Sequence, residues 1–214
     1  PYNPLQYQMP VPVPTKHRQL WVWVLPGLCQ LTPADVMRGE ETQIAGVLCQ
    51  HKEFSGVLCL PGTHSKWALC QAGEVASFST FMTGELFDLL SKQSVLRHSV
   101  VDDQWSDDAF KQGVQDAVNN PAQLTSELFS VRARDILGNG ATRFGKARLS
   151  GLLIGSELEG TREWWQGQKV ILLGDSLLQS LYKLAMEQVN IDVVLLDATQ
   201  MTLAGLTAAY EQQG

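Results

Sequence analysis

The stretch that decides the fold runs over residues 169–201 and reads KVILLGDSLLQSLYKLAMEQVNIDVVLLDATQM. It contains two short apolar runs, 169–173 and 191–196, each with the composition of a buried strand. Between them, residues 175–189 place apolar side chains at helical spacing, and a final helix is expected over 201–210. This strand–helix–strand–helix succession indicates an α/β fold with parallel strand pairing.

Upstream of this unit, turn residues separate three short strands over 56–60, 66–70 and 75–78, which predicts an antiparallel meander. A buried strand is expected over 21–25, and helices are expected over 40–51, 84–90, 107–118, 122–133 and 147–159. Residues 1–20 contain five prolines, which forbid a helix and favour extended chain. We therefore expect a proline-rich extended segment over 1–20 and one folded domain over 21–214.

Composition limits the classes of function. Apolar residues make up 44% of the 214 residues, as in a globular protein, and no apolar stretch reaches the ~20 residues of a membrane span. The balance of 16 basic against 22 acidic residues disfavours a non-specific nucleic-acid binder. Cys29, Cys49, Cys59 and Cys70 form no Cys-x-x-Cys pair and lie among apolar residues. We expect reduced, buried thiols in a cytoplasmic protein, and no zinc site.

A first candidate site is the turn Gly62-Thr63-His64-Ser65-Lys66 between two predicted strands. Glycine lets the backbone turn and approach a ligand, and backbone N–H groups with hydroxyls and a lysine suit phosphate. The Walker A spacing is absent, and a strand rather than a helix follows. The alternative is an ordinary hairpin turn with a surface lysine.

A second candidate surrounds a predicted helix start, where Arg38 precedes Glu40 and Glu41, with Asp35 just upstream. The helix dipole holds carboxylates ionised at this end, and an ionised carboxylate can orient a sugar hydroxyl and accept its proton. Arg38 could bind a carboxylate or a phosphate. The alternative is a solvated first turn in which Arg38 pairs with one of the glutamates.

Two further candidates involve glycines at helices. In Thr83-Gly84-Glu85, the glycine exposes free N–H groups and the flanking side chains could bind a polyol, or Thr83 simply caps the helix. Gly151 and Gly155 lie on one helix face, which permits close approach of a flat ligand or of another helix. The segment Gly174-Asp175-Ser176 ends a strand where α/β folds bind ligands, or it caps the next helix.

Five ordered blocks carry a resemblance that covers about nine tenths of the chain. They are VMRGEETQIAG (36–46), LPGTHSKW (60–67), TFMTGELFDLL (80–90), SGLLIGSE (150–157) and LLGDSLLQSLY (172–182). In this order and spacing they resemble the 2-dehydro-3-deoxygalactonokinases, sugar-acid kinases of the actin/hexokinase/Hsp70-like ATPase superfamily. The resemblance implies ribonuclease-H-like α/β domains and ATP-dependent phosphorylation, with Mg²⁺, of the 6-hydroxyl of 2-dehydro-3-deoxy-D-galactonate.

The resemblance also implies roles for the candidate residues. Gly62, Thr63, His64, Ser65 and Lys66 would bind phosphate, and Gly174, Asp175 and Ser176 would form the adenosine element with Gly151 and Gly155 on the adenine side. Arg38, Thr83, Gly84 and Glu85 would bind the sugar acid. Glu40 is the preferred proton acceptor, with Glu41 not separated from it and Asp35 in reserve.

The front of the chain departs from the family. Residues 1–25 lack the family's first phosphate hairpin, whose aspartate helps to place Mg²⁺, so no metal ligand is assigned. The expectation is that 1–20 is the remainder of an absent N-terminal domain, and that this incomplete kinase has little activity and an exposed face that favours self-association. The alternatives are an exopolyphosphatase-like phosphohydrolase, in which a glutamate activates water, and a non-enzymatic nucleotide-binding fragment.

Overall fold

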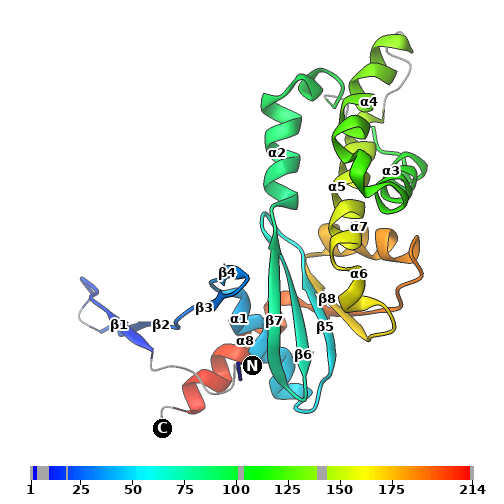
Figure 1. Ribbon diagram of the computed structural model, residues 1–214. Coiled ribbons are helices and arrows are strands. Elements are labelled where there is room, and N and C mark those ends of the chain that lie inside the picture. Colours follow the sequence, from blue (N-terminus) through cyan, green and yellow to red (C-terminus); the bar gives the residue numbers. More distant parts are fainter. Residues whose placement is uncertain (1, 4–9, 18, 101–103, 139–143, 213–214) are drawn as a thin grey trace.

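A five-stranded mixed sheet forms the centre of the computed structural model, which describes residues 2–3, 10–17, 19–100, 104–138 and 144–212. Its order is β7-β6-β5-β8-β9 (Figure 1), with bounds β5 Gly56–Leu60, β6 Ser65–Gln71, β7 Glu74–Phe81, β8 Val170–Gly174 and β9 Val193–Asp197. The predicted antiparallel meander β5–β6–β7 and the predicted parallel pair β8–β9 are confirmed. A parallel pairing of β5 with β8 joins the two into one sheet.

Successive residues of β5 serve two different cores, because side chains alternate between the faces of a strand. Leu58 packs into a core against helices α1 (Glu40–Gln50) and α8 (Ala198–Glu211), which meet where Gly46 contacts the backbone of Met201. Its neighbours Val57 and Cys59 belong to the core on the opposite face.

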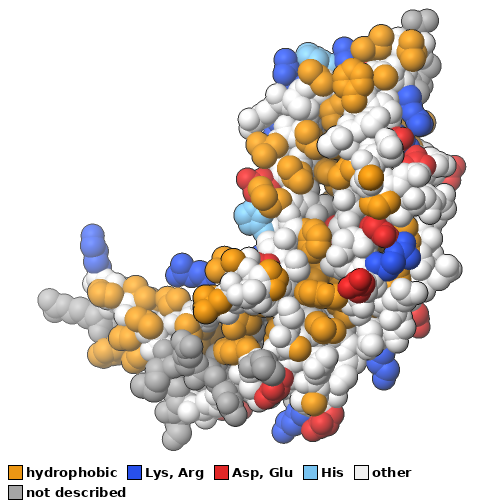
Figure 2. Space-filling model, in the orientation of Figure 1, with side chains coloured by type: hydrophobic (Ala, Val, Ile, Leu, Met, Phe, Trp, Pro, Cys, Tyr) orange, Lys and Arg blue, Asp and Glu red, His pale blue; other side chains and the backbone are white. Residues whose placement is uncertain are grey.

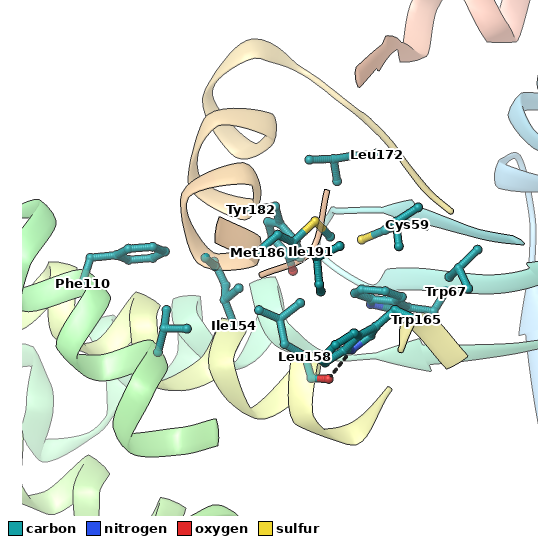
Figure 3. Packing of buried hydrophobic residues seen from close by; sticks show 14 of the residues in the cluster. Cys59, Trp67, Phe110, Ile154, Leu158, Trp165, Leu172, Tyr182, Met186 and Ile191 are labelled. Atoms are coloured by element: carbon teal, nitrogen blue, oxygen red, sulfur yellow. Dashed lines mark hydrogen bonds between the residues drawn. The ribbon is translucent and has the colours of Figure 1, made fainter. Parts of the chain in front are cut away.

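That opposite core lies under helices α5 (Gly145–Gly160), α6 (Arg162–Trp165) and α7 (Ser176–Glu187). Figure 3 shows Trp67 of the sheet beside Leu158 and Trp165, with Tyr182 and Met186 of α7 above them. The Trp165 indole N–H donates to the Leu158 carbonyl at 2.8 Å, so this large apolar ring is buried without an unpaired donor.

A helical layer extends beyond one end of the sheet (Figure 1). It comprises α2 (Thr83–Gln93), η1 (Val95–His98), α3 (Asp107–Asn119), η2 (Pro121–Gln123) and α4 (Leu124–Leu137). The buried guanidinium of Arg148 on α5 bonds to Asp116 of α3 at 2.8 Å and to Glu127 of α4 at 2.6 Å, which ties three helices together. All the helices expected here are present.

Two small hairpins precede the sheet, β1 (Val11–Val13) with β2 (Val22–Val24) and β3 (Leu28–Leu31) with β4 (Ala34–Met37). The prediction of a buried strand over 21–25 was wrong, because β2 pairs with β1 alone and leaves Trp21 83% exposed. Exposed apolar side chains gather on these two hairpins (Figure 2). The β1–β2 pair also crosses the expected boundary between residues 20 and 21.

The cysteines match the expectation only in part. Cys59 and Cys70 are buried in the sheet, and burial raises the pKa of the Cys70 thiol to about 12. Cys49 is half-buried and Cys29, on the β3 hairpin strand, is exposed, so the expectation of four buried thiols was wrong. Throughout the described part of the chain, we find no helix with the length and apolar character needed to cross a membrane.

Candidate functional site

The turn between β5 and β6 holds the predicted Gly62–Lys66 segment, and the start of α2 packs directly against it. The N–H of Glu85 donates to the carbonyl of Thr63 at 3.0 Å. A Cβ at Gly84 would lie 2.5 Å from the Gly62 carbonyl oxygen, so only glycine allows this approach. The structure therefore brings together two segments that the sequence placed about twenty residues apart.

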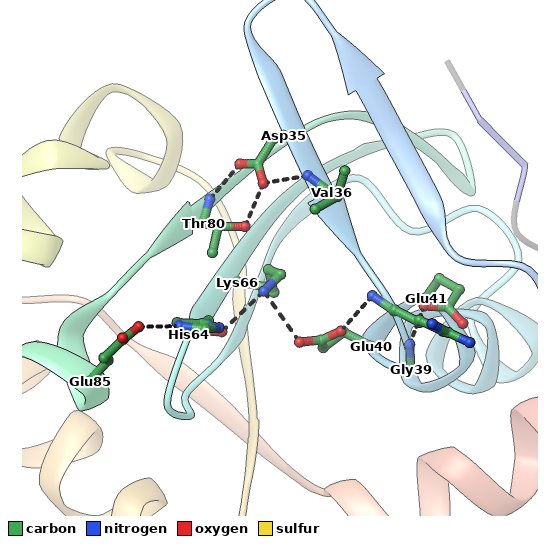
Figure 4. Close-up of polar contacts among 10 residues, drawn as sticks. Asp35, Val36, Gly39, Glu40, Glu41, His64, Lys66, Thr80 and Glu85 are labelled. Carbon is green, nitrogen blue, oxygen red and sulfur yellow. Dashed lines mark hydrogen bonds and ion pairs between the residues drawn. The ribbon is translucent and has the colours of Figure 1, made fainter. Parts of the chain in front are cut away.

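A row of polar side chains crosses this hairpin (Figure 4), and we call Glu85, His64, Lys66 and Glu40 the polar row. The His64 ring nitrogen Nε2 lies 2.5 Å from a carboxylate oxygen of Glu85. The Lys66 ammonium donates to the His64 carbonyl at 3.2 Å and lies 3.3 Å from Oε1 of Glu40. The acidic helix start and the hairpin are thus neighbours.

The structure separates the two glutamates, of which the sequence analysis preferred Glu40 without excluding Glu41. Glu41 is 2% exposed and accepts the N–H of Gly39 at 2.6 Å, and burial raises the pKa of its carboxyl. The side chain of Glu40 is 28% exposed and accepts the N–H of Arg38 at 3.0 Å. Glu40 is therefore the carboxylate of the pair that an incoming ligand can reach.

Asp35 and Arg38 have different surroundings. Asp35 accepts the N–H and the hydroxyl of Thr80 at 2.7 and 2.6 Å, and also the N–H of Val36 at 2.7 Å. These bonds tie β4 to β7 and occupy its carboxylate (Figure 4). Arg38 is exposed beside Glu40, and its backbone rather than its guanidinium contacts that carboxylate.

A cavity of about 470 Å³ opens on the other side of the hairpin, between α2, α5 and α7. Its wall is mostly apolar with a few polar groups, the usual character of a small-molecule site. The lining consists of Gly62, Thr83, Gly84, Phe87, Trp105, Lys146, Ser150, Leu153, Ile154, Leu177, Leu178, Leu181 and Tyr182. Three of the residues predicted from sequence are in this set, whereas Arg38, Glu40 and Glu41 are not.

Two hairpin side chains point away from solvent, contrary to expectation. Ser65 is fully buried and its hydroxyl shares a 2.8 Å hydrogen bond with the hydroxyl of Tyr182. Lys66 is only 4% exposed and belongs to the polar row, so it is not a surface lysine. Thr63 and His64, in the turn that precedes β6, are exposed, and Gly62 is half-buried.

The glycine pair on α5 lies against α3. A Cβ at Gly151 would lie 2.1 Å from the Phe110 carbonyl oxygen, and one at Gly155 would lie 2.6 Å from that of Val114. The close approach that these glycines permit is therefore that of another helix, the alternative left open by the sequence. Neither residue lines the cavity, which takes its α5 wall from Ser150, Leu153 and Ile154.

The segment Gly174-Asp175-Ser176 joins the end of β8 to the start of α7. The carboxylate of Asp175 accepts the N–H groups of Leu177 and Leu178 at 3.1 and 3.0 Å, which is the capping alternative. Both leucines line the cavity, so the cap fixes part of its wall. The predicted cap at Thr83 was wrong: Met82 precedes the helix, and the Thr83 hydroxyl bonds to Glu157.

Glu157, which sequence reasoning missed, lies behind this wall at 2% exposure. Its carboxylate accepts the indole N–H of Trp67 at 2.7 Å, the hydroxyl of Tyr182 at 2.7 Å and the hydroxyl of Thr83. The available signal was an acidic residue within the long apolar run of 147–159. Burial raises the pKa of the Glu157 carboxyl, while its hydrogen bonds act in the opposite direction.

The described ranges contain no cluster of side chains that could ligate a metal ion. Within 2–3, 10–17, 19–100, 104–138 and 144–212, no three histidine, cysteine, aspartate or glutamate side chains gather as a metal site would require. We therefore assign no residue of these ranges to Mg²⁺. The sequence made no such assignment either.

Comparison with known proteins identifies relatives. The family model of 2-keto-3-deoxy-galactonokinase matches residues 2–209. A Rhizobium meliloti (strain 1021) protein named 2-dehydro-3-deoxygalactonokinase DgoK1 is 42% identical over 192 residues, which cover 87% of this chain and 63% of that protein. The 2-dehydro-3-deoxygalactonokinase of Escherichia coli (strain K12) is 35% identical over 188 residues, covering 86% and 63% respectively.

A solved structure gives the same result. A crystal structure described as a 2-dehydro-3-deoxygalactonokinase protein from Sinorhizobium meliloti superposes with a TM-score of 0.87 and 39% identity. The match covers 95% of this chain and 67% of the other. The chain thus spans 63% of the length of the two curated relatives it matches. With a family model that matches from residue 2 to residue 209, the chain belongs to the 2-keto-3-deoxy-galactonokinase family.

Proposed function

We propose that this chain forms the nucleotide-binding part, and part of the sugar-acid site, of a kinase that phosphorylates the 6-hydroxyl of 2-dehydro-3-deoxy-D-galactonate with ATP and Mg²⁺. The observation that carries the proposal is the position of the β5–β6 hairpin. One side of it lines the cavity through Gly62, and its other side contacts the acidic helix start through Lys66. We further propose that the sheet is the core of a ribonuclease-H-like, actin-type ATPase domain.

The cavity is proposed to hold the nucleoside. Its apolar wall from Leu177, Leu178 and Ile154 suits a flat base, and Ser150 adds a hydroxyl. The phosphates would then extend towards Gly62 and the exposed Thr63, where a backbone without a Cβ permits close contact. Gly151, Gly155 and Asp175, which the sequence analysis assigned to the nucleotide, would shape the wall from behind rather than touch the ligand.

The sugar acid is proposed to lie beyond the hairpin, near Glu40. Arg38 is exposed there and can pair with the substrate carboxylate. In the reaction the 6-hydroxyl oxygen forms a bond to the γ-phosphorus, the bond from that phosphorus to the ADP oxygen breaks, and the hydroxyl proton passes to Glu40. Glu85, which is paired with His64, would bind a substrate hydroxyl at the other end of the polar row.

Titration calorimetry of ADP–Mg²⁺ binding to the chain tests the proposal. Binding is preferred to turnover as the first readout, because the chain spans 63% of the length of its curated relatives. We expect saturable binding of one nucleotide per chain, and the absence of any nucleotide binding would overturn the proposal. Release of phosphate from ATP without sugar acid, in an amount that sugar acid leaves unchanged, would favour a phosphohydrolase instead.

A further inference from the structure

Glu157 joins four elements of the fold at one buried point. It projects from α5 and bonds to Trp67 of β6, Thr83 of α2 and Tyr182 of α7. Through the Tyr182 hydroxyl the contacts extend to Ser65, at the hairpin end of β6. Thr83 and Tyr182 both line the cavity, whereas Glu157 does not, so the carboxylate holds the cavity wall from behind.

The direction of these hydrogen bonds depends on the charge of Glu157. An ionised carboxylate only accepts, so the hydroxyl protons of Thr83 and Tyr182 point at it. Tyr182 has then used its single proton, and Ser65 must donate to the Tyr182 oxygen. An ionised Glu157 therefore fixes the orientation of every hydroxyl between the cavity wall and the hairpin.

Burial of the Glu157 carboxylate carries an energetic cost. Removing it from water is unfavourable unless good hydrogen bonds replace hydration, and the described residues provide no ion pair to it. Three donors nevertheless converge on its two oxygens, each from a different element. An amide could not replace it without loss, since glutamine offers one oxygen and turns an N–H₂ group towards donors.

We propose that Glu157 is a positioning residue that sets the shape of the nucleotide cavity by holding Thr83 and Tyr182 in place. The inference rests on the proposed function, because it assumes that the cavity receives a nucleotide. Glu157 acts through these two residues and touches no ligand itself.

The test compares the native chain with Glu157→Gln, which has nearly the same shape but lacks the charge. Glu159→Gln is the matched control, because Glu159 lies on the same helix and pairs at the surface with Arg162. We expect Glu157→Gln to bind ADP–Mg²⁺ about tenfold more weakly while its circular dichroism remains native, and Glu159→Gln to bind normally. Equal affinities of the native chain and Glu157→Gln would overturn this inference alone, whereas a native chain that binds no nucleotide would overturn the proposed function as well.

The pH dependence of the affinity supplies a readout that general loosening of the core would not give. The ratio of native to Glu157→Gln affinity cancels the titration of the nucleotide itself. The ionisable groups facing Glu157 are Tyr182 of α7 and Cys59 of β5, and burial raises the pKa of each well above its ordinary value, so both stay neutral. We expect the ratio to fall towards one as pH is lowered through the raised pKa of Glu157, since protonated Glu157 resembles glutamine. A ratio that does not change with pH would contradict the role of the charge.

Tyr182→Phe keeps the test decisive if Glu157→Gln does not fold. It retains the ring in the cavity wall and removes only the hydroxyl that connects Glu157 with Ser65. We expect ADP–Mg²⁺ affinity to fall by roughly threefold or more. An unchanged affinity in a folded Tyr182→Phe chain would overturn the inference.

Discussion

The Nζ atom of Lys66 lies 3.3 Å from Oε1 of Glu40, and the two side chains differ in exposure, at 5% and 28%. The pair connects the hairpin beside the cavity to the first turn of α1. It also keeps an accessible carboxylate in a fixed place, because Arg38 donates its backbone N–H to the other oxygen. Removal of the Glu40 charge should therefore affect Lys66, which is buried, more than removal of the Lys66 charge affects Glu40, which water can reach.

Glu40→Gln is expected to destabilise the chain more than Lys66→Met. The first change leaves the Lys66 ammonium buried without its carboxylate, at a cost of about 1–3 kcal/mol in the free energy of unfolding. The second replaces a buried cation with an apolar chain of similar length and lets Glu40 hydrate, at a cost below about 1 kcal/mol. Urea unfolding of both variants measures the difference, and the reverse order would show that Lys66 is not held by this pair.

Gly62→Ala is expected to weaken nucleotide binding without affecting folding. No atom lies within 4 Å of a Cβ at Gly62, so the free energy of unfolding should change by less than about 0.5 kcal/mol. The added methyl would occupy the cavity edge where the phosphates are proposed to lie, and we expect a loss of about tenfold or more in ADP–Mg²⁺ affinity. Normal affinity in this variant would place the phosphates elsewhere.

Gly84 also lines the cavity, but Gly84→Ala, unlike Gly62→Ala, is expected to destabilise the fold. Its Cβ would lie 2.5 Å from the Gly62 carbonyl oxygen and 2.8 Å from the Thr63 Cα, both backbone atoms that cannot easily move. We expect a loss of about 1–3 kcal/mol in the free energy of unfolding. Thermal melting with and without ADP–Mg²⁺ checks this, and native stability would show that α2 does not rest on the hairpin.

Asp35→Asn should act on stability alone. The amide keeps one acceptor oxygen and cannot serve all three donors from Thr80 and Val36, so we expect a loss of about 1–3 kcal/mol in the free energy of unfolding. Calorimetry should show ADP–Mg²⁺ affinity unchanged within about twofold. A variant of native stability that nevertheless fails to bind or to turn over sugar acid would return Asp35 to the list of catalytic candidates.

Burial of Glu157 predicts a stability that falls as pH rises. The pKa of its carboxyl is raised above the ordinary value of 4.5, so the folded chain holds a proton that the unfolded chain has already released. Between the unfolded and folded pKa values, the free energy of unfolding must therefore decrease with increasing pH. Glu157→Gln should lose this contribution, as seen by urea unfolding across pH. An equal slope in native and variant chains would show that Glu157 titrates alike in both states.

Local patterns predicted most of the central sheet, because apolar runs, turns and helical spacing are properties of short segments. The meander β5–β7 and the pair β8–β9 followed from such patterns. The β5–β8 pairing did not, since it joins strands more than a hundred residues apart in sequence. The exposed position of Trp21 was also beyond prediction, because its apolar run has the same composition as a buried strand.

Local sequence patterns likewise indicated only some features of the candidate site. The hairpin contacts Gly84 and Glu40 in the fold, and in the sequence only the chemistry of each segment suggested that they form one site. Spacing could not tell Glu40 from Glu41, since neighbouring helical residues differ in burial only once the helix has a partner. Glu157 was missed because three of its partners come from distant segments, and a buried acid looks in sequence like any other helical glutamate.

A crystal structure of this chain with ADP–Mg²⁺ tests the nucleotide site most directly. We predict that the base and ribose lie in the cavity between α2, α5 and α7, against Leu177 and Leu178, and that the phosphates lie at Gly62 and Thr63. Nucleotide bound at another surface, with this cavity empty, would contradict the proposed function.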